Sequence, residues 1–207
     1  MESFSRVVEA AMRSIPFEYA VNSAKYKSPQ SFIFHSISVG TLSLEICNTI
    51  SLSNEIAKKQ LESLANDYGI TAEELCFYGG FLHDWSKLSK EYQKREEIAK
   101  SIVQKLGIKD ADSFLYNISL TAESNLPDNL HMPLWVSIKL ADMMMASGIK
   151  SVVDVFYKYI RDEAYSLANK LLNQYYGLQL GYLSSTFRLF TAHISRDIIC
   201  LLYTSDA

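Results

Sequence analysis

Two adjacent ionisable residues, His83 and Asp84, are the part of this sequence best suited to chemistry. They end a glycine-containing, apolar run over residues 76–84 that has the pattern of a buried helix. An imidazole and a carboxylate are costly to bury unless they are paired or bind a metal ion. The pair therefore predicts further metal ligands elsewhere in the chain.

Two more polar residues, His35 and Asp142, fall on the apolar faces of predicted helices. His35 has the helical spacing of Val39 and Leu42, and Asp142 lies in a stripe that includes Ile138. A histidine in such a place is often a satisfied core residue, so His35 alone is weak evidence. A carboxylate there needs a cation or several hydrogen-bond donors.

Together His35, His83, Asp84 and Asp142 supply two imidazoles and two carboxylates from separate predicted helices. This mixed set of nitrogen and oxygen ligands suits Mn²⁺, Ni²⁺, Co²⁺ or Fe²⁺, and it also accepts Zn²⁺ or Mg²⁺. Neighbouring side chains on a helix are rotated by about 100°, so both members of the pair reach one ion only where the helix ends. We expect such an end at His83.

The order His, His-Asp, Asp resembles the HD superfamily of metal-dependent phosphohydrolases. The resemblance spans about residues 30–150 and implies an all-α, HD-domain helical bundle whose metal is held by the four residues above. It also implies catalytic roles for Asp84 and for Lys87, which stands where the family motif His-Asp-x-Gly-Lys has its lysine. Ser86 replaces the glycine of that motif.

Within the superfamily, two segments are similar to CRISPR HD nucleases: residues 79–87 and the run Lys-Leu-Ala-Asp-Met-Met-Met-Ala-Ser over 139–147. The likeness is greatest to the type I-D effector large subunit, and the Cas3-type nuclease comes second. This resemblance implies cleavage of phosphodiester bonds in single-stranded DNA during CRISPR interference. Other CRISPR effector subunits and a helicase are the implied partners.

The sequence departs from two-metal members of the superfamily, which carry further histidines between the doublet and the last aspartate. In that interval, His131 and Glu123 are the candidates for a second metal or a substrate contact. We therefore expect one firmly bound metal ion and no organic cofactor. His193 and Asp197 lie beyond the motif and are interpreted as structural.

Two alternative functions fit the same residues. The first is an HD phosphohydrolase that acts on nucleotides or other small phosphate esters, which predicts a closed pocket. The second is a non-catalytic interaction domain with a vestigial metal site, which predicts that metal removal changes stability alone. The intact set of four ligands counts against the second alternative.

The composition predicts a single domain over residues 1–207, because 48% of the chain is hydrophobic and 21% is charged. The net charge of −3 lacks the basic footprint of a duplex-binding protein, although residues 87–109 are locally basic. No apolar stretch reaches the roughly 18 residues of a membrane span. Three dispersed cysteines and the absence of a secretion signal favour the cytoplasm.

Helical periodicity and capping signals predict helices with no strands. The threonine at 71 and the glutamate at 74 form a capping box. Ser53 is the predicted N-cap of the helix over residues 54–68. An abrupt apolar end near residue 202 predicts that this chain is the N-terminal part of a longer protein. The expected helices are 2–14, 30–50, 54–68, 72–84, 88–106, 111–123, 133–147, 150–174 and 184–203, the last two packing on the rest.

Overall fold

The computed structural model describes residues 2–20, 31–121 and 132–146, and these residues form helices without a strand, which confirms the all-α prediction. The predicted helices 150–174 and 184–203 lie outside the described residues. In chain order the elements are α1 (Glu2–Ser14), α2 (Phe17–Ala20), α3 (Phe32–Ser53), α4 (Glu55–Tyr68), α5 (Ala72–Leu82), the 3₁₀ turn η1 (Trp85–Lys87), α6 (Tyr92–Lys105), α7 (Ala111–Ser119) and α8 (Met132–Ala146).

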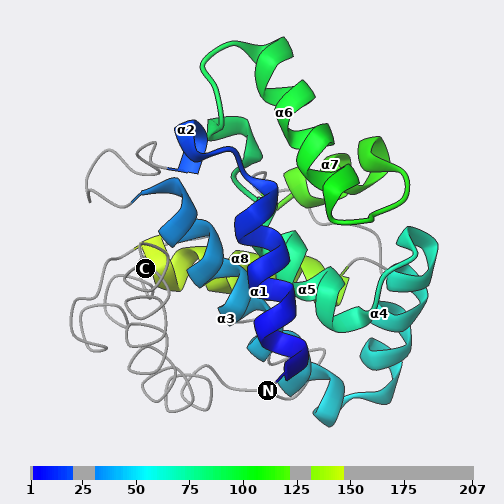
Figure 1. Cartoon of the computed structure of the whole chain (residues 1–207). Helices are drawn as coiled ribbons and strands as arrows, with labels where there is room; N and C mark the ends of the chain where they lie inside the picture. The colour runs from blue at the N-terminus through cyan, green and yellow to red at the C-terminus, as the bar shows by residue number, and fades with distance from the viewer. Residues whose placement is uncertain (1, 21–30, 122–131, 147–207) are drawn as a thin grey trace.

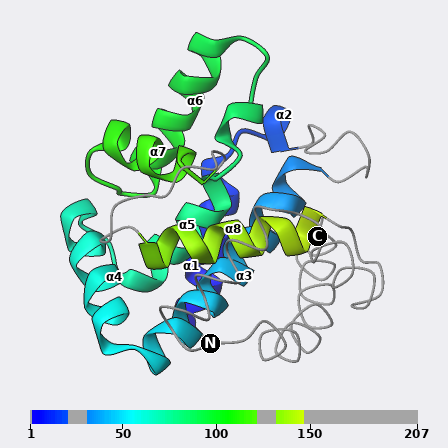
Figure 2. The same cartoon turned by 180° about the vertical axis from the view of Figure 1, so that it is seen from behind.

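The centre of the molecule is the helix pair α3 and α5. Helix α1 crosses this pair on one side (Figure 1), and α8 crosses it on the opposite side (Figure 2). Because α3 is covered on several sides, it is apolar almost all round, and even its polar Ser36, Ser38 and Ser43 are buried. His35 lies in α3, and His83 directly follows the last residue of α5.

Helices α3 and α5 touch backbone to backbone at Gly40 and Gly80. A Cβ atom on Gly80 would lie 2.9 Å from the Gly40 Cα and 2.8 Å from the Ser43 Cβ. A Cβ atom on Gly40 would lie 2.8 Å from the carbonyl oxygen of Phe77. Only glycine allows this approach, so the sequence of this crossing sets how close the two helices lie.

Local capping explains where the helices begin and end. The capping box is present: the Thr71 hydroxyl accepts from the Glu74 N–H, and a Glu74 carboxylate oxygen accepts from the Thr71 N–H at 2.8 Å. The prediction of Ser53 as an N-cap was wrong, because Asn54 caps α4 and its side chain accepts from the N–H groups of Ile56 and Ala57.

Other boundaries also differ from the prediction, and α3 ends at Ser53 and not near residue 50. Helix α6 begins at Tyr92 and not near residue 88, because Leu88 turns into the core and is fully buried at the end of η1. Helix α7 ends at Ser119 and not near residue 123. The short helix α2, which Pro16 precedes, was not predicted.

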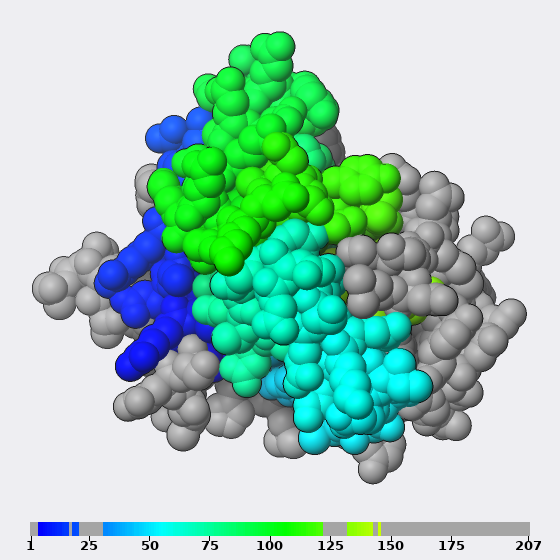
Figure 3. Space-filling view, turned by 90° about the vertical axis from the view of Figure 1, so that its right-hand side faces the viewer, coloured from blue at the N-terminus to red at the C-terminus, as the bar shows by residue number. Residues whose placement is uncertain are grey.

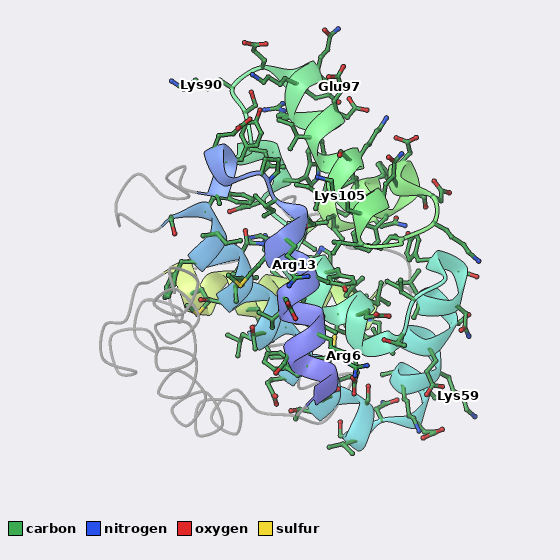
Figure 4. The ribbon with its side chains drawn as sticks, viewed as in Figure 1. Arg6, Arg13, Lys59, Lys90, Glu97 and Lys105 are labelled. Carbon is green, nitrogen blue, oxygen red and sulfur yellow. The ribbon has the colours of Figure 1, made fainter. Side chains whose placement is uncertain are left out.

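Helices α6 and α7 pack together over one end of the central pair, and α4 closes the other end (Figure 3). Lysines are frequent on this outer layer, from Lys90 before α6 to Lys59 on α4 (Figure 4). None of the helices in the described part of the chain has the length and apolar character that crossing a membrane requires.

Candidate metal centre

Three helices bring the predicted site residues together. His35 lies in the first turn of α3, which begins after the N-cap Ser31, and Asp142 lies near the end of α8. His83 is the C-cap of α5, and Asp84 follows with φ −99° and ψ 22°, outside helical geometry. The helix therefore ends at the doublet, as expected, and both side chains of the doublet turn toward one place.

The four side chains form a ring in which nitrogen and oxygen atoms alternate. The Nε2 atom of His35 lies 3.5 Å from the Asp84 Oδ2 and 3.3 Å from the Asp142 Oδ1. The Nε2 atom of His83 lies 3.4 Å and 3.3 Å from the same two oxygens. One ligand atom of each residue lies within 4.8 Å of all the others.

This spacing fits a shared metal ion better than a set of direct hydrogen bonds. Bonds of about 2.0–2.2 Å from a metal to nitrogen or oxygen leave neighbouring ligands roughly 3–3.5 Å apart. Both Nε2 atoms are buried and have no hydrogen-bond partner among the described residues. A buried polar atom of this kind is costly unless something else satisfies it. The group of His35, His83, Asp84 and Asp142 can therefore hold a metal ion.

The ring of His83 is fixed from behind. Its Nδ1 atom lies 2.7 Å from the carbonyl oxygen of Gly80, one turn earlier in α5. Donation of the Nδ1 proton to this carbonyl directs Nε2 toward the carboxylates, as is common for metal-binding histidines. Apart from the spacing of three residues between Gly80 and His83, nothing in the sequence indicates this contact.

The electrostatics of the site favour a positive charge at its centre. Burial opposes protonation of His83, but the charges of Asp84 and Asp142 outweigh it and raise the pKa of His83 to about 10. Burial likewise opposes ionisation of Asp84, yet His83, His35 and Lys87 hold the pKa of this carboxyl well below its usual range. A divalent cation would neutralise the charge of the two carboxylates, as the His83 proton does when no metal ion is bound.

Among the described residues, the site is closed on the histidine side and open on the other. The side chains of His35 and His83 are 0% and 4% exposed, whereas those of Asp142 and Lys87 are 31% and 40% exposed. Asp142, predicted in an apolar stripe, therefore lies at the rim. The Lys87 ammonium group donates to the Asp84 Oδ2, so the lysine stands beside the opening.

The candidates for a second metal or a substrate contact, His131 and Glu123, lie outside the described residues, as do His193 and Asp197. One contact was not predicted at all. Arg95 of α6 donates from Nη1 to the Ser86 carbonyl oxygen at 3.3 Å and so ties α6 to η1, next to the site. Because Arg95 is nine residues after Ser86, helical spacing does not indicate that the two residues are in contact.

The fold and the site define an all-α protein with a His/Asp group that can hold a divalent metal ion. No protein-family model and no curated protein is similar enough to this chain to count as a match. The chain is similar to solved structures of a CRISPR-Cas nuclease. The type I-D CRISPR-Cas nuclease Cas10d is 53% identical over 82% of this chain, with a TM-score of 0.71.

The second structure is Cas10d in complex with the SIRV3 AcrID1 (gp02) anti-CRISPR protein. It is 52% identical over 84% of this chain, with a TM-score of 0.73. In both cases the chain spans 21% of the solved Cas10d chain, or about a fifth of its length. The similarity therefore concerns one region of a much longer protein.

Proposed function

We propose that this chain is the HD nuclease domain of a type I-D CRISPR effector large subunit and that it cleaves single-stranded DNA with a divalent metal ion. The observation that carries the proposal is the ring of His35, His83, Asp84 and Asp142 with one open side. Identity of 53% to the Cas10d nuclease over most of the chain supports the same assignment.

The metal would be held by the two Nε2 atoms and by one carboxylate oxygen each from Asp84 and Asp142. Mn²⁺, Ni²⁺, Co²⁺ and Fe²⁺ match these ligands, and Mg²⁺ and Zn²⁺ remain acceptable. An ion bound here supplies Lewis-acid polarisation of a phosphoryl oxygen and an activated water nucleophile.

The protein's own groups have separate tasks. Asp84 Oδ2 faces both imidazoles and also accepts from Lys87, so this carboxylate holds the ligand set and the lysine in one arrangement. Lys87, half-exposed at the opening, is placed to stabilise negative charge that develops on the phosphate oxygens. The two buried histidines exclude water from the opposite side.

A polymeric substrate suits the open side of this site. The alternative substrates, nucleotides or other small phosphate esters, predict an enclosed pocket around the metal ligands. A separate hollow of about 670 Å³ lies between α1 and the start of α5. It is lined by Arg6, Val7, Ala10, Thr71, Glu73, Glu74 and Tyr78.

The test is a cleavage assay with two substrate classes. The chain is incubated with Mn²⁺ or Ni²⁺, with and without chelator, and with labelled single-stranded DNA or a panel of nucleotides. We expect metal-dependent DNA cleavage that His83→Ala and Asp84→Ala abolish. Asp67→Ala, which removes an exposed carboxylate on α4, is the matched control and should cut normally.

Two results would overturn the proposal in different ways. DNA cleavage that persists in both His83→Ala and Asp84→Ala would show that the metal assignment is wrong. Hydrolysis of nucleotides without any cleavage of DNA would leave the metal centre in place and establish the small-ester alternative.

A further inference from the structure

We infer that residues 85–95 form a platform that binds single-stranded nucleic acid beside the metal centre, with the ring of Tyr92 stacking on a base. The inference rests on the proposed function and deepens it, because it says where the strand lies outside the ring of metal ligands. Four observations on this segment carry it: its charge, its exposure, its connection to Asp84, and the setting of Tyr92.

The platform is basic in an acidic protein. Residues 85–95 contain Lys87, Lys90, Lys94 and Arg95 against the single carboxylate of Glu91, a formal charge of +3 in a chain whose total is −3. The three lysines are exposed. Figure 4 shows Lys90 projecting away from the body of the molecule beside the start of α6. Such a concentration of cations attracts a phosphate backbone.

Direct contacts connect the platform to the metal centre. Lys87 donates to Asp84, which is one of the four ligands. The carbonyl oxygen of Ser86, the residue before Lys87, accepts a hydrogen bond from Arg95 of α6 at 3.3 Å. Leu88, which follows Lys87 in the chain, is fully buried and anchors the segment in the core. A strand whose phosphate lies at the open side of the site would therefore meet this surface next.

Tyr92 provides a platform for a base. It is 60% exposed at the first position of α6, although a tyrosine usually buries most of its ring. The guanidinium carbon of Arg95 lies 4.8 Å from the ring centroid, so a cation–π contact holds the ring in place. An exposed, pre-positioned aromatic ring among cations is the usual arrangement for binding single strands without sequence preference.

The first test is equilibrium binding of a fluorescein-labelled oligothymidylate of about 15 nucleotides, measured by anisotropy in chelator so that no cleavage occurs. We expect Tyr92→Ala to weaken binding at least about fivefold and Tyr92→Phe to bind normally, because stacking requires the ring and not the hydroxyl. Tyr116→Ala is the matched control, since Tyr116 on α7 is 65% exposed. An oligouridylate arm distinguishes DNA from RNA as the preferred strand.

The second test is the salt dependence of binding. The slope of log K against log salt should fall by about 0.7 for each lost phosphate contact when Lys90 and Lys94 are changed to alanine. Changing Lys58 and Lys59 on α4, an exposed pair of the same charge, should leave the slope unchanged. Equal slopes for the two double variants would overturn the platform.

The outcomes separate the platform from the proposed nuclease. Tyr92→Ala should hydrolyse a small chromogenic phosphodiester as fast as the unmodified chain, because that substrate uses the metal centre and Lys87 and has no base to stack on Tyr92. Tyr92-dependent binding in a chain that never cuts DNA would contradict the nuclease and keep the platform. Equal binding by Tyr92→Ala and Tyr116→Ala, or no binding by the unmodified chain, would overturn the platform and leave the nuclease to its own assay.

Discussion

At the scale of single residues, the site is defined by which group carries positive charge. Two carboxylates face two imidazoles at 3.3–3.5 Å, and without a metal the His83 proton neutralises part of their charge. Metal and proton therefore compete for the same Nε2 atom. This competition makes both metal affinity and metal-free stability depend on pH.

The pH dependence of stability follows from His83. Its pKa in the folded protein, about 10, is raised above the ordinary 6.5, so its contribution is fully present below pH 6.5 and is lost as the pH rises through about 10. We expect the melting temperature of chelated protein to fall over that interval by more than in His83→Gln, which cannot titrate. The melting curves of the two proteins check this, and an equal fall in both would contradict it.

For Lys87, a role in stabilising charge during hydrolysis can be separated by experiment from a role in holding the metal ligand Asp84. Lys87→Ala should slow hydrolysis of a small phosphodiester by roughly 10²-fold, because a cation at the developing charge is lost. Metal content should stay the same, since Lys87 contacts Asp84 and is not itself a ligand. Metal analysis and steady-state rates measure the two effects, and Lys90→Ala is the control. Loss of metal from Lys87→Ala would show that its role is to hold Asp84.

At the scale of elements, the crossing of α3 and α5 determines how close His35 and His83 can lie. A Cβ atom on Gly80 would meet the Gly40 Cα, the Val39 carbonyl and Ser43 on the opposite helix, whereas one on the adjacent Gly79 would meet the flexible ends of Ile138 and Leu134. Alanine substitutions at Gly80 and Gly79 can therefore be compared as test and control within the same helix.

Gly80→Ala should destabilise the protein by about 1–3 kcal/mol, because backbone atoms cannot give way, and it should also weaken metal binding by separating the two histidines. Gly79→Ala should be close to neutral, since its Cβ would meet the Ile138 Cδ1 at 3.0 Å and helix propensity favours alanine by about 1 kcal/mol. Chemical denaturation and metal titration of both variants test this. Equal stability of the two would contradict the account of the crossing.

Much of the helical pattern could be predicted from the sequence, because caps and periodicity are local. The Thr71 capping box and the glycine at 69, with φ 70°, fix the ends of α4 and α5 without reference to the rest of the protein. The start of α6 could not be predicted in this way. Leu88 has a helical pattern with its successors, and its burial against distant core residues ends that pattern.

At the scale of the whole molecule, the four candidate ligands could be named from the sequence because each type is unusual where it stands. Their convergence on one ion was implied by the resemblance to the HD superfamily, and the helical patterns alone could not predict it, since it depends on how α3, α5 and α8 cross. The contact between the buried Cys47 and Cys76 is a similar case. Burial and a hydrogen bond of the Cys76 thiol with Cys47 raise the pKa of Cys76 well above its usual range, yet the two residues are 29 positions apart.

The exposure of the site also belongs to this scale. Asp142 was expected on an apolar stripe, but the end of α8 brings it to the rim, where it leaves an open side next to Lys87 and the platform. The proposed single strand would reach the metal ligands through this opening.

The central claim is that His35, His83, Asp84 and Asp142 bind one divalent metal ion between them. The most direct measurement is an anomalous difference map from crystals of the chain grown with Mn²⁺. We predict a strong peak within about 2.0–2.4 Å of both Nε2 atoms and of a carboxylate oxygen from each aspartate. A map without a peak among these four residues, in crystals where Mn²⁺ is present, would contradict the account.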